Sequence, residues 1–341
     1  MAQMDGQTVY LPNPLRDMKW PWARRMNPFY EEVKEEADYW FMSLKCFDET
    51  DNKNFIRCDF ARLAALCYPD LKREQYRLAC DMFTLFFLFD EYTDVANGKK
   101  AQELADLALK PLRNLNAECP ENAHALEKVA IGFWRRFMAV ASETCQELFI
   151  KSWREYAEGV VQEAKDRLER TVPRSFYTGD LMRLRKLTAG VAPCIAMCFI
   201  GKECPRGFFG DPALIRLVDV TVEIVSFEND TYSFQKEDAT GDIHNLLQAI
   251  MHDQACSLQN ALYYAEKETK CRAAEFMAIA KTLHSQDPDV QTYIKDLGTL
   301  IIGHTLWSFE TQRYFGTVHK KVEKERKLVL SAEKKRVVCW E

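Results

Sequence analysis

An acidic cluster, Asp90-Glu91-Tyr92-Thr93-Asp94, directly follows five apolar residues. On a helix, Asp90 and Asp94 share one face because they are four residues apart. The cluster is expected near the C-terminal end of a helix, where the helix dipole disfavours each acidic side chain by about 0.3–1 kcal/mol. Binding of a divalent cation would explain this unfavourable placement, since such ions prefer oxygen ligands. The alternative is an ordinary acidic helix end.

A second cluster combines three kinds of oxygen donor. Asn229, Ser233 and Glu237 are spaced by four residues, so a helix places them on one face. An amide oxygen, a hydroxyl and a carboxylate form a site suited to Mg²⁺ and leave coordination positions for water and phosphate. Lys236 beside them can hold an anion as a point charge. The alternative is a polar face exposed to solvent.

Basic side chains that suit a phosphate group occur in two further places. Arg313 and Tyr314 are adjacent and offer donors for phosphate oxygens. Arg183 and Arg185 offer the same chemistry. Each pair alone is equally typical of polar residues on an exposed protein surface. Only the combination of motifs indicates a phosphate site.

Taken together, these motifs resemble those of the class I terpene synthases, most closely the fungal, basidiomycete-type sesquiterpene cyclases. The segment 90–94 matches the family's D(D/E)xxD motif, with Glu at its second position. The segment 229–237 matches the NDxxSxxxE metal triad without departure. Arg313-Tyr314 matches the terminal RY pair. The resemblance covers about Trp20 to Gly316.

One stretch departs from the family pattern. The segment 185–190 resembles the RRxTxG stretch that holds the diphosphate-sensing arginine, but Lys186 replaces the second arginine. Arg183 lies two residues upstream at a spacing that also fits. The sequence therefore leaves open which of Arg183 and Arg185 senses the diphosphate.

The resemblance implies a sesquiterpene synthase that ionises farnesyl diphosphate, releases pyrophosphate and cyclises the carbocation to a C15 terpene, with 1,11-closure as one of several routes. It implies three Mg²⁺ ions, with Mn²⁺ as a substitute. The implied metal ligands are Asp90, Asp94, Asn229, Ser233 and Glu237. The implied diphosphate-binding groups are Arg185, Lys236, Arg313 and Tyr314. The aromatic candidates to line the pocket and stabilise cations are Phe86, Phe87, Phe89 and Trp307; ordinary core packing is the alternative for each.

The elements that would position these residues are helices. Glycine (13) and proline (12) are too scarce in 341 residues for a protein with many strands and turns. Apolar periodicity predicts helices that include 72–94, 179–200, 212–237, 244–269, 271–284 and 288–318. We therefore expect an all-α fold: one helical-bundle domain of the class I terpenoid synthase type, with an apolar cavity. Its expected limits are 29–319, between an irregular arm (1–28) and a basic terminal helix or tail (320–341).

Composition excludes several other classes. The net charge of −5 gives no general attraction to nucleic acid. No apolar run approaches the 18 residues of a membrane span. The N-terminus has no signal region, so the twelve cysteines are expected to be reduced, mostly buried thiols in a cytoplasmic protein. Whether the chain is a monomer or a homodimer stays open.

Two other functions compete with a cyclase. A prenyl chain-elongating transferase uses the same bundle and diphosphate chemistry, but would carry a second aspartate-rich motif where Asn229 to Glu237 stands. A non-catalytic protein that binds a hydrophobic ligand would need neither both metal motifs nor the converging basic residues. No DxDD run is present, which disfavours cyclisation started by protonation.

Overall fold

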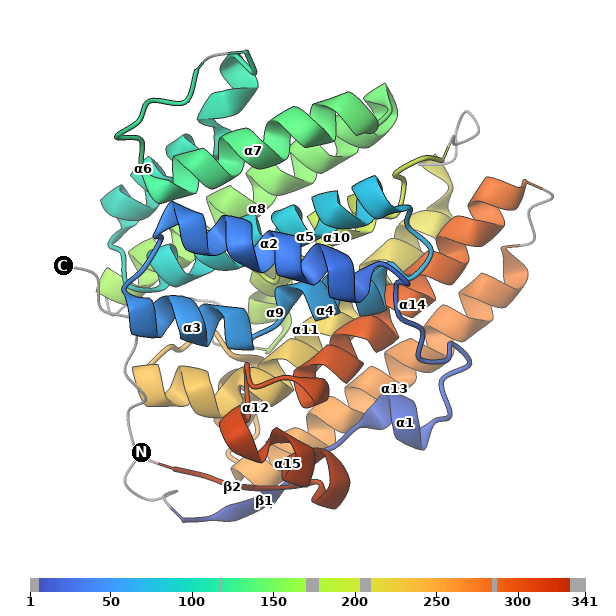
Figure 1. Ribbon diagram of the computed structural model, residues 1–341. Helices are drawn as coiled ribbons and strands as arrows, with labels where there is room; N and C mark the ends of the chain where they lie inside the picture. The colour runs from blue at the N-terminus through green and yellow to red at the C-terminus, as the bar shows by residue number, and fades with distance from the viewer. Residues whose placement is uncertain (1–5, 117, 170–177, 203–209, 284–286, 332–341) are drawn as a thin grey trace.

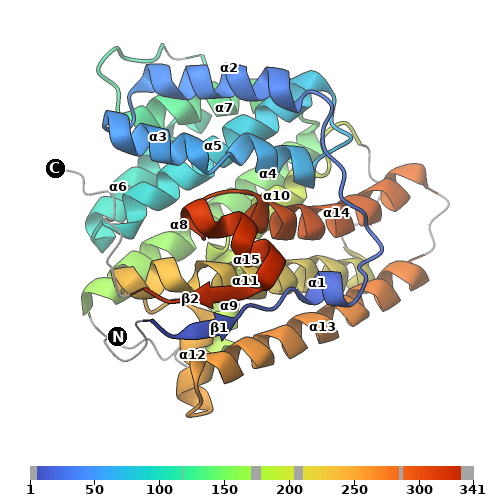
Figure 2. The ribbon, with the colours of Figure 1, turned by 60° about the horizontal axis from the view of Figure 1, so that its bottom comes forward.

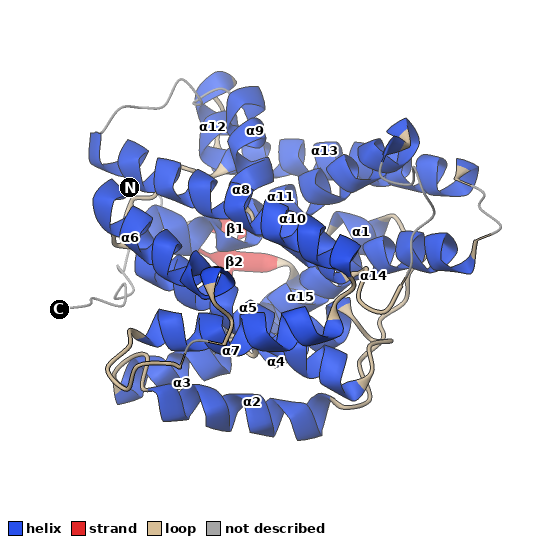
Figure 3. Ribbon diagram, turned by 90° about the horizontal axis from the view of Figure 1, so that it is seen from above, coloured by secondary structure: helices blue, strands red, loops and turns tan. Residues whose placement is uncertain are grey.

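Helices form nearly all of the structure, a computed structural model that describes residues 6–331 apart from 117, 170–177, 203–209 and 284–286 (Figure 1). Within these residues the strands β1 (Thr8–Tyr10) and β2 (Lys327–Val329) form one small ribbon (Figure 3). The predicted all-α fold is therefore confirmed. The helices are, in chain order, α1 (Pro14–Asp17), α2 (Tyr30–Leu44), α3 (Glu49–Arg57), α4 (Phe60–Cys67), α5 (Arg73–Asp94), α6 (Gly98–Leu109), α7 (Ala125–Val140), α8 (Glu143–Glu169), α9 (Thr178–Thr188), α10 (Val191–Met197), α11 (Pro212–Thr240), α12 (Leu246–Asp253), α13 (Leu258–Thr282), α14 (Pro288–Glu310) and α15 (His319–Glu325).

Two groups of helices enclose a central set. In Figure 1, α6, α7 and α8 lie at the upper left and α11, α13 and α14 at the lower right, with α4, α5 and α10 between them. Helix α4 packs on both α5 and α14, and α11 packs on both α13 and α14. This arrangement surrounds α5 and explains why it is apolar nearly all round: fifteen of its residues are buried.

The long helix α11 has well-defined ends. Pro212 is its first residue, where the missing amide hydrogen costs nothing. The Asp211 carboxylate caps it by accepting from the amides of Ala213 and Leu214. Gly241 ends the helix with φ at +79°, a left-handed conformation that glycine adopts without strain. These local signals fix where α11 starts and stops, and so where its polar residues lie.

The prediction of one helix over 179–200 is wrong. The chain breaks at Gly190, where φ is +68°, and α10 starts in a new direction. A Cβ built on Gly190 would lie 3.5 Å from the Phe86 ring. The left-handed backbone ended the helix, although the apolar pattern continues across the break.

Two other predicted boundaries also differ. The segment 244–269 contains two helices, because the chain turns after α12 with φ at +45° for Ala255 and Ser257 caps the start of α13. Helix α13 then runs through into the segment predicted separately as 271–284. Helix α14 ends at Glu310 rather than 318, because Thr311 is extended, with φ −122° and ψ 174°.

The arm and the tail pair with each other. Strand β1 of the arm runs antiparallel to β2 of the tail, with Val9 opposite Leu328 (Figure 2). The Arg326 guanidinium also donates to the Leu11 carbonyl at 2.9 Å. The arm is therefore not wholly irregular, and the tail is not simply a terminal helix; residues 332–341 lie outside the described part.

Two further expectations meet the structure here. No helix among the described residues is long and apolar enough to span a bilayer. Every cysteine that the structure describes is a free thiol, as expected, and six of these ten cysteines are buried.

Candidate active site

A cavity of about 930 Å³ lies between α3, α4, α5, α8, α9, α10, α11 and α14. Helix α5 brings the acidic motif to one wall, and α11 brings the second polar motif to another. The nine polar residues that the resemblance implies as metal ligands or diphosphate-binding groups all line this one cavity, although they come from separate parts of the sequence: Asp90, Asp94, Arg185, Asn229, Ser233, Lys236, Glu237, Arg313 and Tyr314. Tertiary packing thus gathers four separate segments around a common space.

The second acid of the first motif holds two cations. Arg313 donates to Glu91 through a short hydrogen bond, and Lys236 Nζ lies 3.4 Å from the same oxygen. Burial alone would raise the pKa of Glu91, but these two cations lower it to about 2. The other amino group of Arg313 lies 3.4 Å from Asp90. Glu91 therefore stays ionised and keeps both basic side chains pointed at the acidic wall.

Of the two candidate sensor arginines, only Arg185 reaches the cavity. Its Nη2 donates to Asp230 at 2.6 Å and to the Asn229 side-chain oxygen at 2.9 Å. Arg185 is only 8% exposed, whereas Arg183 faces outward and pairs with Asp180 next to it on α9. The structure thus separates two arginines that the sequence could not.

The second motif offers oxygen atoms on one face of α11. The Ser233 hydroxyl is buried in the cavity wall without a hydrogen-bond partner in the described part of the chain. Asn229 Nδ2 donates to the Tyr314 hydroxyl at 2.9 Å, and Asn245 Nδ2 donates to Glu237 at 2.8 Å. Burial raises the pKa of Glu237 to about 7, and the Asp230 carboxylate adds to this shift.

This donor set fits Mg²⁺, which binds through a few protein oxygens and keeps other positions for water and phosphate. The orphaned Ser233 oxygen is the observation that supports a metal there, since a buried hydroxyl without a partner costs free energy. Among the described residues, no three His, Cys, Asp or Glu side chains converge enough to hold a metal ion by themselves. Metal binding would therefore depend on the amide, the hydroxyl and an added phosphate.

The aromatic candidates separate into two groups. Phe86, Phe87 and Trp307 line the cavity, and the rings of Phe87 and Trp307 lie 5.7 Å apart. Phe89 is fully buried behind this wall, where it packs against Trp153 and Tyr156 at ring distances of 6.1 and 5.8 Å. The structure thus gives Phe89 the packing role, because its direction from α5 points into α8.

A comparison with known protein families identifies the chain. Residues 81–275, more than half of its length, match the family described as "Terpene synthase family 2, C-terminal metal binding". The chain belongs to this family. It is a terpene synthase, a class I terpene cyclase, as its motifs predict.

Curated relatives support the assignment over nearly the whole chain. The synthase is 34% identical to Delta(6)-protoilludene synthase 8 of Postia placenta, with 96% of each chain covered. It is 33% identical to sesquiterpene synthase Agr8 of Cyclocybe aegerita, over 95% of this chain and 91% of that one. The family is therefore that of the basidiomycete sesquiterpene synthases.

Solved structures share the fold. The synthase superimposes on α-eudesmol synthase with a TM-score of 0.74 at 22% identity, covering 85% of this chain and 97% of that one. For linalool/nerolidol synthase from Streptomyces clavuligerus the TM-score is 0.72 at 19% identity, covering 84% and 98%. The predicted bundle of the class I terpenoid synthase type is thus confirmed.

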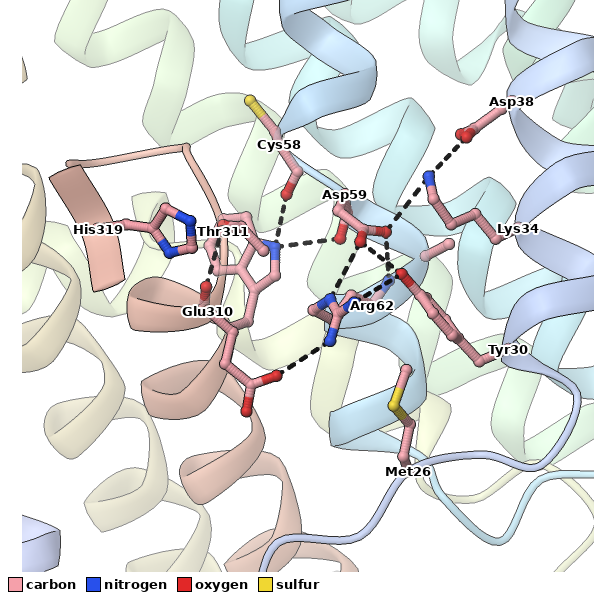
Figure 4. Close-up of polar contacts among 12 residues, drawn as sticks. Met26, Tyr30, Lys34, Asp38, Cys58, Asp59, Arg62, Glu310, Thr311 and His319 are labelled. Atoms are coloured by element: carbon pink, nitrogen blue, oxygen red, sulfur yellow. Dashed lines mark hydrogen bonds and ion pairs between the residues drawn. The ribbon is translucent and has the colours of Figure 1, made fainter. Parts of the chain in front are cut away.

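A polar network fixes the indole of Trp307. Its Nε1 donates to the carbonyl oxygens of Cys58 and Asp59, at 2.8 and 3.1 Å. Figure 4 shows the surroundings: the Asp59 carboxylate accepts from Tyr30 and Arg62, and Arg62 also pairs with Glu310 at 3.1 Å. The network joins α2, the start of α4 and the end of α14 around the single polar atom of the indole.

Sequence reasoning missed several cavity residues. Tyr156 of α8 lines the cavity beside Phe86, and nothing in its local sequence distinguishes it from core. Leu300 and His304 also line it. Their spacing from Trp307, by seven and three residues, is a signal that could have found them, since these positions share a helix face.

Proposed function

We propose that this terpene synthase binds farnesyl diphosphate with Mg²⁺, releases pyrophosphate and cyclises the carbocation to a C15 terpene, with a first closure between C1 and C11. The observation that carries the proposal is the division of one cavity. Hydrogen bonds and ion pairs link the oxygen donors and basic side chains into one polar end. The aromatic side chains of Phe86, Phe87 and Trp307 line the same cavity. The names of relatives, sesquiterpene synthase and protoilludene synthase, support a C15 substrate.

At the polar end, the basic residues receive the leaving group. Arg313 and Lys236 are held by Glu91, and Arg185 is held by Asp230. A diphosphate that enters competes with these carboxylates for the same donors. Charge-assisted hydrogen bonds to its oxygens strengthen as the C–O bond breaks and the electron pair leaves with the diphosphate.

The metal ions belong to the same end. We propose that Asp90 and Asp94 hold Mg²⁺ on the α5 wall and that Asn229, Ser233 and Glu237 hold it on the α11 wall, three ions in all, with Mn²⁺ as a substitute. Bound there, the ions supply Lewis-acid charge to the diphosphate. The Asn229 side-chain oxygen now accepts a hydrogen bond from Arg185, and it must give up this bond in order to bind the metal.

At the apolar end, the side chains protect and fold the cation. Phe86, Phe87 and Trp307 present aromatic faces, which attract cations within about 6 Å of the ring centre. The same rings exclude water, which would otherwise quench the cation as an alcohol. Attack of the distal double bond on the allylic cation forms the ring and moves the positive charge along the chain.

Incubation of the purified protein with farnesyl diphosphate and Mg²⁺, with and without isopentenyl diphosphate, tests the proposal. Cyclic C15 products by gas chromatography–mass spectrometry, independent of isopentenyl diphosphate, are the expected result. Longer diphosphates formed only with isopentenyl diphosphate would identify an elongating transferase instead. Ligand binding without turnover would identify a non-catalytic binding protein.

A further inference from the structure

A histidine lies in the cavity wall away from the diphosphate-binding residues. Leu300, His304 and Trp307 project from one side of α14 and line the cavity. Because a helix rises about 1.5 Å per residue, His304 lies roughly 4.5 Å further than Trp307 from the C-terminal end of α14, which Arg313 follows. His304 is 8% exposed.

A buried carboxylate stands behind this imidazole. Glu228 of α11 is 1% exposed, and its Oε2 lies 3.7 Å from His304 Nδ1. Thr305 donates to the same oxygen at 2.7 Å. No other described cation is paired with Glu228, so His304 is the group beside it that can carry positive charge.

This pair is not explained by stability. Glu228 Oε1 and His304 Nδ1 are both buried without a hydrogen-bond partner among the described residues. Leaving such atoms unsatisfied costs free energy, and an apolar pair of similar size would avoid the cost. Buried, poorly satisfied polar groups beside a reaction cavity indicate a chemical role.

The proposed reaction requires a base that can reach the cyclised cation. A cyclised carbocation becomes a hydrocarbon only when it loses a proton. Cys67 and Cys194 also line the cavity, but burial raises the pKa of both thiols, that of Cys194 to about 12, so they stay protonated. The helices α4, α5, α10 and α11 also contribute hydrocarbon side chains to the cavity wall, such as Leu63, Phe83, Val191 and Val225.

We propose that His304 is the proton acceptor that ends the cyclisation, with the Glu228 side chain, 3.7 Å from Nδ1, orienting its imidazole; this rests on the proposed function. In the proposed step, Nδ1–H faces Glu228 and Nε2 faces the cation. A C–H bond next to the cationic carbon breaks, its electron pair becomes the new C=C bond, and the proton moves to Nε2. The imidazolium passes the proton to water when the cavity opens.

The test compares His304→Ala, His304→Gln and Glu228→Gln with the wild-type enzyme, using farnesyl diphosphate and Mg²⁺. We expect the share of the principal hydrocarbon to fall at least about tenfold in both His304 variants, with other alkenes or alcohols in its place. Glu228→Gln should shift the products in the same direction. His252→Ala, a change at an exposed histidine outside the cavity, should keep the wild-type profile.

Chemical rescue separates a base from a space-filling ring. Imidazole added to His304→Ala should restore the principal hydrocarbon in proportion to its concentration. Thiazole, a ring of the same size but a much weaker base, should not. Equal rescue by both rings would overturn the proposal in favour of a steric role.

Other outcomes also decide. An unchanged profile in both His304 variants overturns the proposal, and the proposed function stands. If the wild-type enzyme releases only alcohols, its reaction ends by capture of water. This result overturns the role of His304 as proton acceptor, and the proposed function stands. A wild-type enzyme that makes no terpene overturns the proposed function itself. If His304→Ala does not fold, His304→Gln, which is closer in size and polar, carries the product comparison.

Discussion

At the scale of single residues, the first prediction concerns the two motifs proposed to bind Mg²⁺. Asp90→Ala and Asn229→Ala should each lower turnover at least about 10²-fold, roughly 2.7 kcal/mol, because each removes an oxygen donor from one wall. Pyrophosphate release at saturating Mg²⁺ measures the effect. Glu103→Ala removes an exposed carboxylate on α6 and serves as the control. Full wild-type activity in excess chelator would contradict metal dependence altogether.

Trp307 and Arg313 should separate product choice from ionisation. Trp307 carries no charge, and in the proposed function its indole face would stabilise a later cation by roughly 0.5–2 kcal/mol. About 1.4 kcal/mol changes a ratio of competing routes tenfold. Trp307→Phe should therefore keep substantial pyrophosphate release but shift the products towards linear or early-quenched alcohols. Arg313→Ala should suppress pyrophosphate release itself.

Released pyrophosphate and the hydrocarbon profile are measured in parallel for both variants. Phe89→Leu is the matched control for an aromatic change on the neighbouring wall, since Phe89 packs behind the cavity. It should lower the free energy of unfolding and keep the profile. An unchanged profile in Trp307→Phe would assign Trp307 to core packing and leave the metal ligands unaffected.

At the scale of elements, the start of α4 controls how Trp307 is held. Asp59 has φ at +51°, and its carboxylate caps α4 by accepting from the Arg62 amide. Glycine adopts this backbone freely, whereas alanine pays about 1 kcal/mol or more for it. Asp59→Ala should therefore lower the free energy of unfolding by about 1 kcal/mol more than Asp59→Gly, measured by urea denaturation.

The same variants test the link to the product. If the Asp59 backbone orients the indole, Asp59→Ala should shift the products in the direction of Trp307→Phe, and Asp59→Gly should shift them less. Equal stability and equal profiles for the two variants would show that the left-handed turn does not matter to either property.

At the scale of the whole molecule, anion binding should close the cavity. The arm is tied to α14 by Arg24, which pairs with Glu310 at 2.7 Å, and by the Trp20 indole, which donates to the Gly298 carbonyl. Arg313 follows the same helix. Mg²⁺ and pyrophosphate added together should order the arm around 20–25 and the loops after 94 and 237.

Limited proteolysis checks this closure. Nicking in those three segments should slow with Mg²⁺ plus pyrophosphate, and neither alone should suffice. The exposed loop at 118–122, which does not contribute to the cavity, is the internal control. Nicking rates that stay the same in all three segments would contradict closure.

The sequence by itself determined the helical class and the residues and spacing of the two polar motifs. These depend on local geometry: spacings of four residues place Asp90 with Asp94, and Asn229 with Ser233, on one helix face wherever the helix lies. It also located most helices, because the apolar period is a local property. It could not see the break at Gly190, since the apolar pattern continues through it.

Tertiary structure decided what each side chain faces. Whether Phe87 or Phe89 meets the cavity depends on α8, which covers Phe89, and not on their shared composition. Arg185 rather than Arg183 points into the cavity because it forms an ion pair with the buried Asp230 carboxylate of α11. The ring of Trp307 is oriented by carbonyl groups nearly 250 residues earlier in the chain. Such contacts arise only when distant segments pack, so no local pattern carries them.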